Sequence, residues 1–121
     1  MNDKVKTLKK LQFDPSGYTH SELIGFVKNG RHLDILINHN DWRIRSAIAD
    51  QGYGLDILVK DPDSLVRATV ASHGYGLDVL INDETWYVRQ AVAKQGYGLD
   101  KLIHDVNESV RRVAREKLYE E

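Results

Sequence analysis

The pentapeptide GYGLD occurs at residues 52–56, 74–78 and 96–100, and each copy begins 22 residues after the one before. Extending the comparison gives four aligned segments, which we call repeats 1 to 4: residues 30–51, 52–73, 74–95 and 96–117. A fixed period of this length is typical of arrays of stacked structural units. Glycines near a helix start can also cradle phosphate. A phosphate loop occurs once and needs a nearby Lys or Arg, so a pentapeptide that recurs is better explained as a structural joint.

Each repeat contains two helical patterns. In repeat 2, Leu55, Leu58 and Val59 form a short apolar stripe with helical spacing, and Val66 and Val70 begin a second one. The second helix of every repeat is preceded by a residue type that caps helix N-termini: Asp41, Asp63, Thr85 and Asn107. It is followed in repeats 1 to 3 by a glycine that can close the helix in a left-handed conformation: Gly52, Gly74 and Gly96.

The rest of the pentapeptide fits the start of the next repeat. We expect its tyrosine to pack across the junction and its second glycine to admit the next helix into a crowded corner. Its aspartate then lies in a first helical turn, where the helix dipole favours negative charge: Asp56, Asp78 and Asp100. Repeat 1 departs from this pattern at Arg31 and His32, as terminal units often do.

The composition is that of a water-soluble domain. The chain has 121 residues, 41% of them hydrophobic, and a net charge of −1. Without cysteine it can form neither disulfides nor thiolate metal sites. No apolar run approaches the roughly 20 residues that cross a bilayer, and the N-terminus lacks the apolar core of a signal peptide. We therefore expect a cytoplasmic protein with no membrane contact, and most simply a monomer.

The shared pattern resembles the leucine-rich-repeat-variant family and, more widely, HEAT-like repeats. Leu55, Leu58, Asp61, Val66, Arg67, Val70 and Ala71 carry the resemblance in repeat 2, and Leu77, Leu80, Asp83, Val88, Arg89, Val92 and Ala93 carry it in repeat 3. It implies an all-α, right-handed α-solenoid in which each repeat is a pair of helices. Leucine-rich-repeat-variant proteins can bind an iron–sulfur cluster through cysteines, which this chain lacks, so no cofactor is expected.

The resemblance also implies a ladder of ion pairs. In HEAT-like proteins, an Asp in the turn and an Arg six residues later form ladders between units. Three pairs have that spacing: Asp61 with Arg67, Asp83 with Arg89, and Asp105 with Arg111. In repeat 1, His39 stands in the place of the Asp, so no rung is expected there.

Residues 1–29 precede the repeats and are predicted to form a helical cap in one structural domain with residues 30–121. Val5, Leu8 and Leu11 give a weak helical stripe, residues 14–17 a turn, and residues 21–28 a helix. The cap would cover the open side of repeat 1.

Positions that vary between repeats are not constrained by stacking and can carry function. On the second helices these positions share one face, where large aromatic and arginine side chains suggest a contact site. The residues predicted to bind a partner are Trp42, Arg43, Leu65, Trp86, Tyr87, Gln90 and Arg112. Alternatively, each Trp only covers its neighbour at the edge of the core.

We expect a non-enzymatic scaffold that binds a protein partner through this face. Most of the arginines lie on the second helices, so an alternative is nucleic-acid binding through an Arg/Trp stripe. That alternative fails for arginines that are engaged in the aspartate ladder. The histidines have no metal-ligand spacing, and no catalytic pattern stands out, so neither a metal site nor an enzyme is expected.

Overall fold

The structure is a computed structural model that describes residues 12–120, and over this range it is helical and contains no strand. The all-α class predicted from the sequence is confirmed. A 3₁₀ turn, η1 (Pro15–Gly17), precedes helix α2 (His20–Lys28). Short and long helices then alternate: α3 (Leu33–Leu36), α4 (Trp42–Asp50), α5 (Leu55–Leu58), α6 (Ser64–Ser72), α7 (Leu77–Leu80), α8 (Trp86–Lys94), α9 (Leu99–Leu102) and α10 (Glu108–Leu118).

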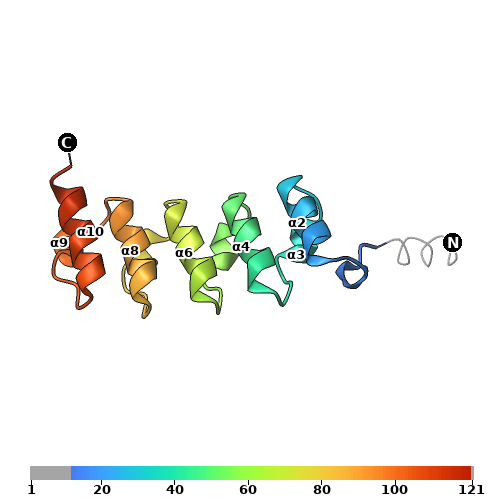
Figure 1. The fold of residues 1–121 in the computed structure, drawn as a ribbon, viewed down its shortest axis with the longest axis horizontal. Coiled ribbons are helices and arrows are strands. Elements are labelled where there is room, and N and C mark those ends of the chain that lie inside the picture. Colours follow the sequence, from blue (N-terminus) through green and yellow to red (C-terminus); the bar gives the residue numbers. More distant parts are fainter. Residues whose placement is uncertain (1–11, 121) are drawn as a thin grey trace, which may run out of the picture.

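The long helices α2, α4, α6, α8 and α10 lie side by side in a row, with η1 and α10 at its opposite ends (Figure 1). Each long helix packs against the next one in the chain. Each short helix contacts the long helix before it and the long helix after it. Every short helix therefore bridges two neighbours, and a single core runs the length of the row.

Leucines of the short helices and aliphatic residues of the long helices form this core. Leu36, Leu58, Leu80 and Leu102 end the four short helices, and each is almost completely buried. They pack with residues at i and i+4 on the long helices, including Ile44 and Ile48, Val66 and Val70, and Val88 and Val92. Burying one such side chain stabilises the fold by about 1.5–3 kcal/mol.

The long helices begin at the residues that the sequence predicts, and most of these residues cap the helix with their side chains. Asp41 accepts a hydrogen bond from the Arg43 N–H, and Asp63 accepts one from the Leu65 N–H. Asn107 accepts hydrogen bonds from two backbone N–H groups of α10. Thr85 has the extended backbone of a capping residue, but its side chain makes no capping hydrogen bond. The capping prediction is therefore confirmed for the side chains at three positions and wrong at Thr85.

The two glycines of the pentapeptide have different physical roles. Gly52, Gly74 and Gly96 follow the ends of long helices with φ between +74° and +78°, and a Cβ there would meet no atom closer than 3.4 Å. Gly54, Gly76 and Gly98 precede the short helices, also with positive φ. At Gly76 a Cβ would lie 2.6 Å from Val59 Cγ2 of the preceding repeat. The first glycine is thus required by the backbone, and the second by the backbone and by close packing between repeats.

Residues before the first repeat cover α4. Thr19 and Glu22 form a capping box at the start of α2, which packs against α4. His32 occupies the place of the second glycine with a left-handed backbone (φ 59°), and its ring stacks on Phe13 at 3.8 Å between centroids. The predicted helix of residues 21–28 is present and begins at His20. The predicted stripe of Val5, Leu8 and Leu11 lies outside the described residues.

Candidate interaction surface

The residues predicted to bind a partner, which we call the second-helix face, lie on four of the long helices. Three large apolar side chains among them lie in the first turns of successive long helices and are exposed by similar fractions: Trp42 of α4 by 38%, Leu65 of α6 by 44% and Trp86 of α8 by 41%. Because α4 packs on α6 and α6 on α8, these three residues sit on adjacent helices. More than half of each residue is nevertheless covered, so each also contributes to packing at the edge of the hydrophobic core.

Polar contacts tie parts of this face together. The Tyr87 hydroxyl is hydrogen-bonded to the Ser64 hydroxyl, which links α8 to α6. The rings of Trp86 and Tyr87 meet edge to face with centroids 5.6 Å apart. The structure therefore brings Trp86 and Tyr87 into one aromatic cluster. Trp42 belongs to a different helix and has no ring contact with this cluster among the described residues.

The charged members of the face differ in how strongly they are held. The Arg43 guanidinium donates to both carboxylate oxygens of Asp41 at 3.1 and 2.9 Å. These hydrogen bonds hold the pKa of Asp41 well below its usual value. Gln90 is half-buried, whereas Arg112 is exposed. Arg43 is thus committed to its local cap, and Arg112 is available to a ligand.

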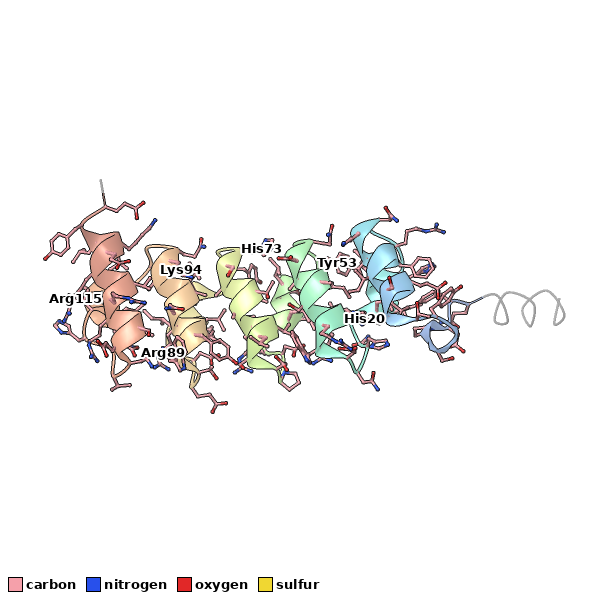
Figure 2. All side chains as sticks on the ribbon, in the orientation of Figure 1. His20, Tyr53, His73, Arg89, Lys94 and Arg115 are labelled. Carbon is pink, nitrogen blue, oxygen red and sulfur yellow. The ribbon has the colours of Figure 1, made fainter. Side chains whose placement is uncertain are left out.

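Three other arginines of the long helices form a ladder that joins neighbouring repeats. Arg67 Nε and Nη2 donate to the two carboxylate oxygens of Asp83 at 2.8 and 3.2 Å, and its Nη1 donates to the Asp61 carbonyl oxygen at 2.7 Å. Arg45 binds Asp61, and Arg89 binds Asp105, with the same atoms and similar distances. Figure 2 shows Arg89 toward one end of α8 and Lys94 toward the other. The ladder therefore runs along the edge of the row where the long helices begin.

The side chains of the ladder have little contact with solvent, and its aspartates also accept hydrogen bonds from the turns. The side chains of Arg67 and Asp83 are only 12% and 8% exposed. Hydrogen bonding to the Asp83 carboxylate raises the pKa of Arg67. Burial works against ionisation of Asp105, but the hydrogen bonds from Arg89 and from a backbone N–H outweigh it and lower the pKa of that carboxyl. Each ladder aspartate also accepts the N–H of the residue two positions later, at 2.9 Å in all three turns.

This geometry corrects two predictions. The carboxylate partner of each arginine lies sixteen residues later, in the next repeat, and the Asp six residues earlier offers its backbone carbonyl instead. Repeat 1 also has a rung, because Arg45 needs only a carbonyl from position 39 and takes that of His39 at 2.7 Å. His39 Nδ1 replaces the carboxylate as acceptor for the turn N–H. Arg111 occupies the equivalent position in the last repeat, and no described residue provides a carboxylate partner for it.

Sequence reasoning missed an exposed apolar edge on the short helices. Ile57 and Val79 occupy equivalent positions in repeats 2 and 3, and each is 58% exposed. The equivalent residue in repeat 4 is Lys101. A position that accepts both Ile and Lys faces solvent, and that exchange was the signal available in the sequence.

Within residues 12–120, no three His, Asp or Glu side chains are arranged to hold a metal ion. In the same range no helix is both long enough and apolar enough to span a bilayer. Comparison with known proteins found no matching family model, no matching curated protein and no matching solved structure.

Proposed function

We propose that the protein is a short right-handed α-solenoid of four 22-residue repeats behind an N-terminal helical cap, built in the manner of HEAT-like or leucine-rich-repeat-variant proteins. It acts as a monomeric, non-enzymatic scaffold in the cytoplasm and binds a protein partner through the second-helix face. The row of long helices and the recurrence of the ladder every 22 residues support the architecture.

The observation that carries the binding proposal is the exposure of Trp42, Leu65 and Trp86 at the starts of three adjacent helices. Exposed aromatic side chains that a fold does not need for stacking are typical anchors of protein interfaces. Repeat 2 has Ser64 at the position of the two tryptophans, so packing does not require an indole there. Tyr87 adds a second ring to the anchor at α8.

Nucleic-acid binding has less support. Arg45, Arg67 and Arg89 are held by buried carboxylates and cannot also bind phosphate without breaking the ladder. Arg43 of α4 is exposed but paired with Asp41. Among the described residues, the exposed arginines of the long helices without a carboxylate partner are therefore Arg112 and Arg115 of α10.

The test is a quantitative pull-down from the native host. It compares wild type, the double variant Trp42→Ala/Trp86→Ala, and the control Tyr53→Ala/Tyr97→Ala. The two tyrosines are each 41% exposed, which is close to the exposure of the two tryptophans. They lie in the joints between repeats and not on the long helices. We expect the tryptophan variant to lose a partner that the tyrosine variant retains, with both variants folded by circular dichroism. Recovery of the same proteins by all three baits would reject the second-helix face.

A further inference from the structure

The four equivalent arginines share one anchor. Arg45, Arg67 and Arg89 each donate from Nη1 to the carbonyl oxygen of the residue six positions earlier, at 2.7 Å. Arg111 makes the same hydrogen bond to the Asp105 carbonyl at 2.8 Å. This anchor fixes the guanidinium beside the turn. In repeats 1 to 3 it leaves Nε and Nη2 to chelate the carboxylate of the following repeat.

In repeat 4 no carboxylate of the described residues is chelated in this way. Arg111 is half-buried and positioned as its counterparts are, yet no described residue accepts from its Nε or Nη2. The apolar contact of the internal junctions is also uncovered. Ile37, Val59 and Ile81 are less than 10% exposed where a glycine of the next repeat meets them. The equivalent Ile103 is only half-buried.

The last repeat differs from the others at one further position on this side. Ala49, Ala71 and Ala93 lie four residues after the ladder arginines, on the same helix face, and are completely buried. Arg115 takes this position on α10 and is exposed. Figure 2 labels it on the side of α10 that faces away from α8. We call Ile103, Arg111 and Arg115 the end face.

We propose that the end face binds an acidic segment of a partner protein. One carboxylate is chelated by Nε and Nη2 of Arg111, as aspartates are chelated three times within this molecule, and Arg115 attracts a second acidic group. The internal junctions indicate the sequence of the bound segment. It would have a glycine that packs against Ile103 and, seven residues later, the Asp that Arg111 chelates, in the same spacing as Gly76 and Asp83. This surface is separate from the second-helix face and does not depend on it.

The position of Arg115 favours a short acidic segment over a complete fifth repeat as the occupant of the end face. A repeat stacked as the others are would bury this guanidinium at the position where Ala49, Ala71 and Ala93 are completely buried. Burying an unpaired charge is strongly unfavourable. A turn or short helix leaves Arg115 at the rim, where it stays solvated. The occupant is therefore a short segment, and the same argument disfavours end-to-end stacking of two copies of this chain.

The probe is a peptide with blocked ends and the sequence of residues 74–85. In the folded chain this segment contains Asp83, the carboxylate that Arg67 chelates. The isotope-labelled protein is titrated with this peptide and with its Asp83→Asn form while the arginine Nε–H and isoleucine methyl signals are followed by NMR. We expect saturable shifts at Arg111 and Ile103 at millimolar peptide. Affinity should fall about tenfold or more with the Asn peptide, because a charge-assisted bidentate contact is lost.

Variants locate the contact. Arg111→Gln and Arg111→Lys should both weaken binding, the lysine because it cannot form the bidentate pair. Arg115→Ala should weaken binding less. The control Lys28→Gln removes an exposed positive charge from α2, which lies far from α10 in the row, and should leave binding unchanged. Circular dichroism confirms that each variant is folded.

Three results would overturn the proposal. One is the absence of saturable binding, or equal binding of the Asp and Asn peptides. Another is Arg111-dependent binding of a short single-stranded DNA at lower concentration than the peptide, which would assign the end face to nucleic acid. The third is a mass by sedimentation that rises with protein concentration and returns to the monomer value in Arg111→Gln. That result would assign the face to a second copy of the chain.

Discussion

Replacing Arg67 by Met tests whether the ladder holds neighbouring repeats together. The substitution keeps most of the apolar stem and removes three hydrogen bonds of 2.8, 3.2 and 2.7 Å to Asp83 and to the Asp61 carbonyl. The Asp83 side chain, only 8% exposed, is left with the turn N–H of Thr85 as its hydrogen-bond donor. The variant therefore leaves a nearly buried carboxylate without its countercharge.

The expected loss follows from that burial. Removing one partner of a buried ion pair typically destabilises a protein by about 3–5 kcal/mol, and charged hydrogen bonds are individually worth about 1.5–3 kcal/mol. Because the pair retains some contact with water, we expect a loss of about 2–4 kcal/mol. For a chain of this size, that corresponds to a melting temperature lower by roughly 10 °C.

The assay is urea unfolding followed by circular dichroism, arranged as a double-mutant cycle with Arg67→Met, Asp83→Asn and the combined variant. We expect a coupling energy of about 1–3 kcal/mol between the two sites. The control Arg112→Met removes an exposed arginine and should change stability by no more than about 0.5 kcal/mol. A coupling energy near zero, or an Arg67→Met loss no larger than that of the control, would refute the structural role of the ladder.

Three further predictions concern the joints, acid and nucleic acid. Gly76→Ala should lower the free energy of unfolding by about 2–4 kcal/mol, and Gly74→Ala by only about 1–2 kcal/mol. Both positions have positive φ, but only the Cβ at position 76 would collide with Val59. Equal melting temperatures for the two variants would contradict this. Folding lowers the pKa of Asp105, so the unfolded chain binds more protons than the folded chain in acid. The stability that this carboxyl contributes is complete above about pH 5, and the free energy of unfolding should fall once the pH drops below about 4. Unfolding midpoints in urea that do not change between neutral and acidic pH would count against that sign. Wild type should show no salt-sensitive binding to short nucleic acids near physiological ionic strength, and fluorescence anisotropy checks this.

The comparison of internal repeats was sufficient to place the helices. Gly52 marks the end of one long helix and Asp63 the start of the next long helix. Each does so through a requirement of its own backbone or side chain, and such requirements are visible in a single sequence. The same comparison identified positions that proved exposed, such as Trp42 and Leu65. Thr85 was mistaken because its residue type permits a cap without requiring one.

The direction of the ladder could not be predicted from spacing. Six residues separate Asp61 from Arg67, and this distance suits a contact to the carboxylate or to the carbonyl equally well. Only the packing of α6 against its neighbours decides that the arginine side chain reaches forward to the next repeat. The uncovered side of Arg111 follows from the same packing and has no signature in the pattern of its own repeat.

The binding of a partner through the second-helix face is tested most directly by titration calorimetry with the partner that the pull-down identifies. Truncating an interface anchor typically costs at least about 2 kcal/mol. We therefore predict that Trp42→Ala/Trp86→Ala weakens the affinity about thirtyfold or more, while Tyr53→Ala/Tyr97→Ala stays within about threefold of wild type. Equal affinities for wild type and the tryptophan variant, with both proteins folded, would contradict the account.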